Sequence, residues 1–341
     1  MYIKRTIRRF SISLCVALCA TASFADSEKI ACEGVDLRVN LPTQQMDAIT
    51  ARLADAPFAR GNHWRAERGG KSIDLIGTIH ISDPRLGPVA ERLTGVIEAS
   101  DLLLLEAGPK EEAALKSDLM SRPELLFLQN DTLPELLPED DWNRLAGEMK
   151  LRGIPPILAS RFQPWYLSMM LGMPPCLLAK LKDGGTNGLD HRLRDIALKA
   201  EIPMQGLEPH DRLFQIFNKD PLDKQIELML LGLETADQSL NALETVIAAY
   251  FDQRAMEAWE ISRMLALQIE GQTPEQLAQL FDEFEENLLT SRNLAWIPVI
   301  LEALETRAQL VVAVGAGHLG GKQGVLALLE HEGFKLKAMP F

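Results

Sequence analysis

Two histidines occupy the same place in two copies of one local pattern. A mainly apolar run ends at Gly77, and His80 follows three positions later. Near the end of the chain a second apolar run ends at Gly315, and His318 follows at the same distance. A glycine lets the backbone turn sharply and approach a ligand. Because imidazole is a common metal ligand and general base, the repeated Gly-x-x-His indicates one shared chemical site.

Two acidic residues also end short apolar segments. Glu106 closes residues 101–106, and Glu208 closes residues 202–208. Since the carboxyl ends of parallel strands meet at one edge of a sheet, we expect both carboxylates to lie near the two histidines. Two imidazoles with one or two carboxylates are suitable ligands for a divalent metal ion.

The elements that must position these residues predict an α/β fold with a central, mainly parallel sheet. Strands are expected at residues 72–79, 101–106, 202–208, 309–314 and 334–339, and helices at 86–99, 189–200 and 321–331. Strand, helix and strand in succession favour a βαβ unit with parallel pairing. We expect the sheet to consist of two related halves, each a strand, a Gly-x-x-His and a helix. A large all-helical insertion is expected at about 110–182 and 209–308.

The composition and the amino terminus restrict the class of protein. The chain has 341 residues and a formal net charge of −13, which argues against nucleic-acid binding because phosphate backbones need basic patches. Residues 1–25 combine a basic start, an apolar middle and a small-residue end at Ala25, as in a secretory signal peptide. Residues 26–341 then form one exported domain, periplasmic or extracellular, without a transmembrane anchor after cleavage.

Two cysteines, Cys32 and Cys176, lie beyond the predicted signal peptide. An oxidising compartment permits a disulfide between them, but the sequence does not give the distance that a bond requires. A disulfide and two free thiols are therefore both open.

Sequence motifs for nucleotide binding and for serine hydrolases are incomplete or absent in this chain. The GAGHLG segment satisfies Gly-x-Gly-x-x-Gly, but the strand that follows, KLKAMPF, has no acid for a ribose hydroxyl. The overlapping AGHLGGKQ has Gln323 where a P-loop has Ser or Thr, so both nucleotide sites are disfavoured. No Gly-x-Ser-x-Gly serine-hydrolase turn occurs. We interpret His63, His191 and His331 as solvated or packing histidines.

Several segments together resemble the TraB/GumN family, over about residues 32–336. They are IGTIHISDPR, LLLLEAG, GLD at 188–190, GLE at 206–208, SRNLAW at 291–296 and VGAGHLGGKQGVLALLEHEGFKL. That family includes the TIKI metallopeptidases and is distantly similar to the erythromycin esterase-like and ChaN-like group. The resemblance implies an α/β fold with a helical insertion, and functional roles for His80, Glu106, Arg292 and His318. It also implies manganese or cobalt as cofactor, with zinc as an alternative.

These observations predict a metal-dependent, peptidase-like hydrolase of a peptide or small molecule that the sequence does not name. His80 and His318 would bind the ion with a carboxylate from Glu106 or Glu208, and the other carboxylate would be the general base. Our assignment places Glu208 on the metal and Glu106 as the catalytic residue.

Two further residues complete the predicted site. Arg292 would clamp a substrate carboxylate or stabilise an oxyanion. Asp190 would orient a histidine, or else stabilise a helix amino terminus. Two other functions are open: reversible binding of haem or a metal ion, as in the ChaN-like group, and sequestration of a peptide without catalysis.

Overall fold

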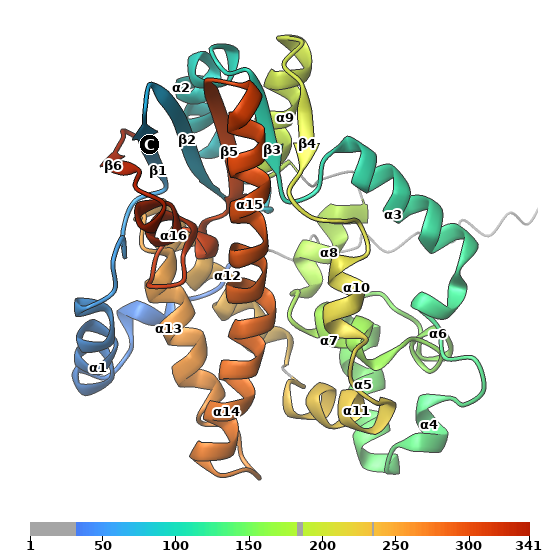
Figure 1. Cartoon of the computed structure of the whole chain (residues 1–341). Helices are drawn as coiled ribbons and strands as arrows, with labels where there is room; N and C mark the ends of the chain where they lie inside the picture. The colour runs from blue at the N-terminus through green and yellow to red at the C-terminus, as the bar shows by residue number, and fades with distance from the viewer. Residues whose placement is uncertain (1–31, 183–186, 234) are drawn as a thin grey trace, which may run out of the picture. The chain divides into compact units, whose positions relative to one another are not determined.

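The computed structural model describes residues 32–182, 187–233 and 235–341 (Figure 1). The predicted signal peptide, residues 1–25, lies outside this part of the chain. Among the described residues, no helix is both long and apolar enough to cross a membrane.

Six strands form one mainly parallel sheet. They are β1 (His63–Arg68), β2 (Lys71–Thr78), β3 (Leu102–Leu105), β4 (Met204–Gly206), β5 (Gln309–Gly315) and β6 (Lys335–Ala338). Their order across the sheet is β4-β3-β5-β2-β1-β6. Strands β2, β3, β4 and β5 pair in parallel, whereas β1 runs antiparallel to both β2 and β6. The mixed α/β class and the mainly parallel sheet are confirmed.

The two strands that carry the Gly-x-x-His motifs are direct neighbours at the centre of the sheet. Strands β2 and β5 pair in parallel with Thr78 opposite Gly315. Both motifs therefore leave the sheet at the same edge, although the two glycines are offset by one position. A division of the fold into two related halves stays a prediction, because the structure shows one continuous sheet.

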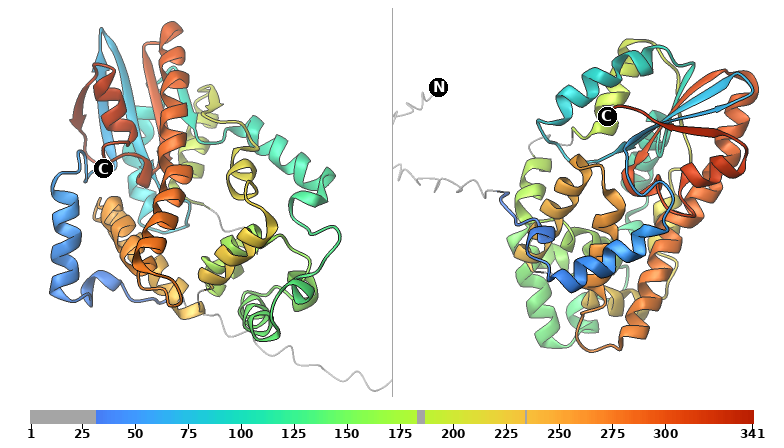
Figure 2. Two further views of the ribbon diagram at one scale, coloured as in Figure 1. Left: turned by 60° about the horizontal axis from the view of Figure 1, so that its bottom comes forward. Right: turned by 90° about the vertical axis from the view of Figure 1, so that its left-hand side faces the viewer.

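Two layers of helices cover the sheet. They are α2 (Leu86–Glu98) and α9 (Leu189–Lys199) on one face, and α15 (Ser291–Thr306) and α16 (Val325–His331) on the other (Figure 2). Side chains alternate between the layers as a strand requires: Val312 and Val314 pack towards α15, whereas Val311 and Ala313 pack towards α2 and α9. The short, fully apolar β3 is buried on both faces for the same reason.

Most of the remaining chain is helical. The other helices are α1 (Thr43–Ala54), α3 (Pro109–Ser121), α4 (Leu133–Leu136), α5 (Glu139–Leu151), α6 (Pro156–Ala159), α7 (Pro164–Leu171), α8 (Pro175–Lys182), α10 (Arg212–Phe217), α11 (Leu222–Leu231), α12 (Ala236–Phe251), α13 (Ala255–Ala266) and α14 (Pro274–Glu285). A π-helical segment, Glu286–Thr290, joins α14 to α15. Many of these helices begin at a proline, which tolerates the first helical position because its missing N–H would have no partner there. The helical part has its own apolar core, which includes Leu145, Leu167 and Met229.

A disulfide bond joins Cys32 to Cys176, with their Cα atoms 5.5 Å apart. It ties the start of the described chain to α8, across 144 positions of sequence.

Candidate active site

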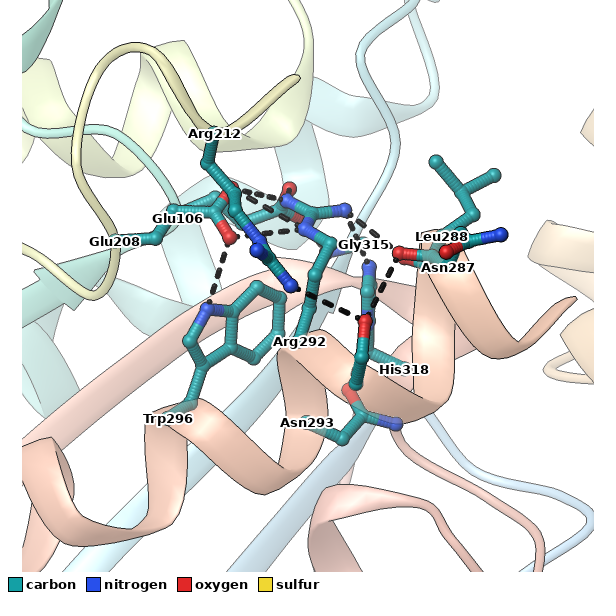
Figure 3. Close-up of polar contacts among 11 residues, drawn as sticks. Glu106, Glu208, Arg212, Asn287, Leu288, Arg292, Asn293, Trp296, Gly315 and His318 are labelled. Atoms are coloured by element: carbon teal, nitrogen blue, oxygen red, sulfur yellow. Dashed lines mark hydrogen bonds and ion pairs between the residues drawn. The ribbon is translucent and has the colours of Figure 1, made fainter. Parts of the chain in front are cut away.

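A recess of about 270 Å³ lies at the carboxyl ends of β2, β3 and β5. Its charged lining residues are His80, Glu106, Glu112, Asp190, His191, Arg194, Glu208 and Arg292. The structure thus brings together the histidine after β2, both strand-end acids and the two residues Asp190 and Arg292. His318 lies directly behind this lining, against Arg292 (Figure 3).

The guanidinium of Arg292, on α15, binds both strand-end carboxylates. Its Nη2 donates to Glu106 Oε2 and to Glu208 Oε1, each at 2.6 Å, and its Nε donates to Glu208 Oε2 at 2.9 Å (Figure 3). Only 4% of the Arg292 side chain is exposed. Burial opposes its charge, but the two carboxylates raise the pKa of Arg292. A buried cation therefore fixes two acids that the sequence placed at the same edge of the sheet.

The ring of His318 is also buried and is held at both nitrogens. Its Nδ1 lies 2.7 Å from Asn293 Oδ1, and its Nε2 lies 3.2 Å from Arg292 Nη1. Since Arg292 can only donate, these partners assign the proton of a neutral ring to Nδ1. Burial, together with the Arg292 charge, lowers the pKa of His318 to about 4, although Glu106 opposes the shift. The ring packs against Trp296 at a centroid distance of 4.5 Å.

Glu106 accepts hydrogen bonds from a backbone N–H as well as from Arg292. The N–H of Gly315 donates to its Oε1 at 2.7 Å. Burial alone would raise the pKa of Glu106, but neighbouring hydrogen-bond donors and basic side chains lower it to about 2. Those groups are His318, Arg292, His80 and the Gly315 N–H. A Cβ at Gly315 would lie 3.3 Å from Glu106 Oε1, so glycine leaves space for this carboxylate.

His80 differs from His318 in almost every respect. Its side chain is 60% exposed, and its Nδ1 lies 3.2 Å from Asp190 Oδ2. The GLD segment presents this acid, because the Leu189 N–H donates to the Ile79 carbonyl at 3.0 Å and docks the start of α9 beside His80. A Cβ at Gly188 would overlap that same carbonyl. The conformation of the loop therefore requires glycine there.

The charge of His80 is stabilised by its neighbours. Desolvation in the recess opposes protonation, but the contact with Asp190 and the charge of Glu106 raise the pKa of His80 to about 9. Burial would raise the pKa of Asp190, but its contacts with His191 and His80 lower it. Within the described part of the chain, no group bonds to the other ring nitrogen of His80, Nε2, which is left for a ligand.

Several residues of the site were missed by the sequence analysis. The sequence predicts a solvated or packing role for His191, but its Nδ1 lies 2.8 Å from Asp190 Oδ2 and the residue lines the recess. Arg194 donates to Glu112 at 2.6 Å across the rim. The SRNLAW segment contained Asn293 and Trp296, but only the fold shows that they face His318. His191 directly follows the GLD segment, and that adjacency was the available signal.

The donor arrangement does not match the predicted metal site. Among the described residues, no group of three or more His, Cys, Asp or Glu side chains is placed to hold a metal ion. Both carboxylates bind Arg292, and His318 directs Nε2 at the same guanidinium. The roles of His80, His318 and Glu208 as metal ligands therefore stay a prediction.

Comparison with known proteins places the chain in a family. It is 24% identical over 280 residues to the Uncharacterized protein YbaP of Escherichia coli (strain K12), a match that covers 79% of this chain and 94% of that protein. The protein of the same name from Shigella flexneri matches with the same identity and coverage. The model of the TraB/PrgY/gumN family matches residues 62–338, a range that contains every residue of the site described above. The chain therefore belongs to the TraB/PrgY/gumN family.

Proposed function

We propose that the recess is the active site of a hydrolase that cleaves neutral acyl compounds, such as esters or peptides. One observation carries this proposal: His80 stands exposed at the recess, its Nδ1 lies against the Asp190 carboxylate, and no described residue bonds to its Nε2. A carboxylate-backed imidazole of this kind can take a proton from water through Nε2. The other groups of the recess then stabilise the charge that forms on the ring.

The charge balance of the recess supports a neutral substrate. Four acids line it, and four basic residues face them: His80, His191, Arg194 and Arg292. Contacts with Asp190 raise the pKa of both histidines, although partial desolvation in the recess opposes the shift. Since the two sets nearly cancel at neutral pH, neither an anion nor a cation is strongly favoured.

The proposed reaction uses His80 as the base and Asp190 as its orienting partner. His80 Nε2 takes a proton from water while the water oxygen bonds to the acyl carbon. The proton then passes to the leaving alcohol or amine as its bond to the acyl carbon breaks, which leaves a carboxylic acid. Glu106 stabilises the intermediate imidazolium through its negative charge. Arg292 acts as a positioning residue, since its N–H groups bond to protein acceptors.

The manganese or cobalt ion that the family resemblance implied does not fit the donors as they are arranged, so we derive no step through a metal.

The proposal that the protein is exported is based on residues 1–25, which have the pattern of a secretory signal peptide. The disulfide between Cys32 and Cys176 supports it, because such bonds persist in oxidising compartments.

The test is hydrolysis of p-nitrophenyl butyrate and of a neutral chromogenic peptide, measured from pH 6 to pH 10. We expect His80→Ala to lower kcat/KM by about 10²–10⁴, as loss of a general base does, and the matched His331→Ala variant to keep full activity. Because the active form of His80 is unprotonated, the wild-type rate should rise with pH until about 9. Asp190→Asn should lower the pH at which the rate levels off, because it removes the carboxylate charge that raises the pKa of His80.

Two outcomes would contradict the proposal. One is wild-type protein that cleaves neither probe, and the other is His80→Ala with an undiminished rate. The first result would favour a non-catalytic role in binding haem, a metal ion or a peptide, and the second would place the catalytic base at a residue other than His80. A parallel assay after treatment with a chelator, with metal analysis of the protein, separates the metal question from the role of His80.

A further inference from the structure

A second and larger cavity, of about 430 Å³, lies in the helical part of the protein. Its walls are mainly apolar side chains from α7, α10, α11 and α14, together with the last residue of α13. Two of these side chains, Met169 and Phe284, are 39% and 43% exposed. This volume is within the range of cavities that enclose small organic ligands, and exposed apolar side chains that gather at one place mark binding sites.

The charged residues of the cavity leave its apolar walls available. They are Lys219, Asp220 and Glu283. Lys219 and Glu283 are exposed and Asp220 is partly buried, so these charges stay in contact with water while a bound group lies against the apolar walls. The cavity is therefore suited to an apolar group rather than to an ion.

The cavity and the recess are lined by consecutive turns of α10. Leu213 lines the recess, whereas Ile216 and Phe217, three and four positions later, line the cavity. Residues at this spacing lie on the same face of a helix, and one turn rises only about 5 Å. Leu213 is 40% exposed, so the recess has an apolar surface on the side of α10 that leads to the cavity.

A second element also borders both sites. Asn287, on the π-helical segment before α15, lines the cavity, and Arg292, on α15, lines the recess. Ser291 joins this element to α10, because its Oγ accepts a hydrogen bond from Arg212 Nη2 at 3.2 Å and donates to the Asn287 carbonyl at 3.2 Å (Figure 3). The recess and the cavity therefore share two walls that are bonded to each other.

We propose that the cavity holds the apolar chain of a substrate whose carbonyl group lies in the recess, an inference that rests on the proposed hydrolase function. The substrate class is then a neutral ester or amide of an apolar carboxylic acid longer than butyric acid. Its acyl carbon lies beside His80, and its chain passes over Leu213 to contact Phe217 and the apolar side chains around it. Each methylene group that the cavity buries raises kcat/KM about fourfold, because burial contributes about 0.8 kcal/mol.

The first test compares kcat/KM for p-nitrophenyl octanoate and p-nitrophenyl butyrate. We expect the octanoate to be preferred at least about tenfold, since burial of two of its four additional methylene groups suffices. Ala266 lines the cavity, so Ala266→Trp should fill it and reduce the ratio of the two constants to about one. The matched Ala51→Trp variant, on the exposed side of α1, should keep the wild-type ratio.

The second test measures binding without turnover. Nonan-2-one and pentan-2-one carry the same alkyl chains as the two esters but no bond that a hydrolase cleaves. In calorimetric titration of the full chain, we expect nonan-2-one to bind at least about tenfold more tightly, and this preference to be lost in Ala266→Trp. Phe284→Asp, at an exposed position of the cavity, should also weaken the preference, and it serves if Ala266→Trp does not fold.

The results separate this inference from the proposed function. Cleavage of the butyrate without preference for the octanoate, and equal binding of the two ketones, would overturn the inference and leave the hydrolase standing. A preference that is undiminished in the folded cavity variants would also overturn it, because the chain then binds elsewhere. If neither ester is cleaved but Ala266→Trp or Phe284→Asp removes tight binding of nonan-2-one, the hydrolase is wrong and the cavity remains a site for apolar chains. Absence of both cleavage and saturable binding would overturn both.

Discussion

Replacement of Arg292 by methionine should destabilise the protein strongly and change how its stability depends on pH. The substitution keeps a long apolar side chain but removes the cation between Glu106 and Glu208. These two carboxylates are only 18% and 9% exposed. Removal of one partner from a buried ion pair leaves a charge without compensation, which typically costs about 3–5 kcal/mol.

Glu106 supplies the pH dependence. Its pKa falls from an ordinary 4.5 to about 2 in the folded protein. That shift corresponds to about 3 kcal/mol of stability at neutral pH. Because the folded pKa is the lower one, this stability is fully present above pH 4.5 and is lost as the pH falls towards 2. In Arg292→Met, the positive charge that opposes the effect of burial on Glu106 is gone, so the pKa of Glu106 rises. The contribution of Glu106 to the free energy of unfolding at neutral pH then shrinks or changes sign.

The assay is urea unfolding at intervals between pH 7 and pH 2. We expect Arg292→Met to be about 3–5 kcal/mol less stable than the wild type at pH 7, and the difference to narrow by up to about 3 kcal/mol at low pH. Arg152→Met is a control for the loss of a buried arginine, because Arg152 is equally buried, does not contact Glu106 and pairs with Glu148 instead. It should lose stability, and its difference from the wild type should narrow less at low pH than that of Arg292→Met, because only one carboxylate loses its partner. A loss below about 1 kcal/mol for Arg292→Met, or a constant difference across the pH range, would refute this reasoning.

Three other perturbations have defined outcomes. Reduction of the bond between Cys32 and Cys176 should cost about 2–5 kcal/mol, because it opens a loop of 144 positions, and thermal unfolding with and without dithiothreitol measures this. Asp74→Asn should lower the free energy of unfolding by about 1–3 kcal/mol at pH 7, because buried His63 donates a hydrogen bond to this carboxylate. Urea unfolding should show this difference fading at low pH, because wild-type Asp74 is protonated there. Gly188→Ala should lower kcat and cost about 1–3 kcal/mol, because its Cβ would overlap the backbone beside the recess; normal activity and thermal stability would contradict this.

The sequence predicted those elements whose side-chain pattern is unambiguous. The wholly apolar residues 102–105 form a buried strand, and the apolar stripe of residues 86–98 forms α2. Strand β1 was missed because its residues, HWRAER, are mostly polar and its inner positions alternate only weakly. It is a strand because β2 and β6 both pair with it, a long-range effect that a local pattern does not contain.

The sequence predicted where the site lies, but not which of its side chains bond to one another. Strand-end acids and histidines were expected at one edge because parallel strands impose that arrangement, and the recess lies there. The link between them is Arg292, which lies 186 positions from Glu106 and 84 from Glu208. No local pattern shows which acids a distant cation will bind, so the sequence assigns the guanidinium to the substrate, Glu208 to a metal ion and Glu106 to catalysis.

The repeated Gly-x-x-His shows how one motif acquires two chemistries. His318 is reached through a short 3₁₀ turn that places the ring beneath α15, where Asn293 and Trp296 enclose it. His80 leaves β2 in an open loop and meets the Asp190 carboxylate. The first ring is buried, neutral and has a lowered pKa, whereas the second is exposed and has a raised pKa.

This asymmetry determines what each histidine can do. A buried ring with both nitrogens engaged can only orient Arg292, so His318 sets the position of the guanidinium and, through it, of Glu106. An exposed ring with a free nitrogen can exchange a proton with a ligand. The two motifs are therefore alike in sequence and in leaving adjacent parallel strands at one edge of the sheet, but they differ in the turn that follows each strand. The chemistry of each histidine follows from the side chains that other elements bring to it.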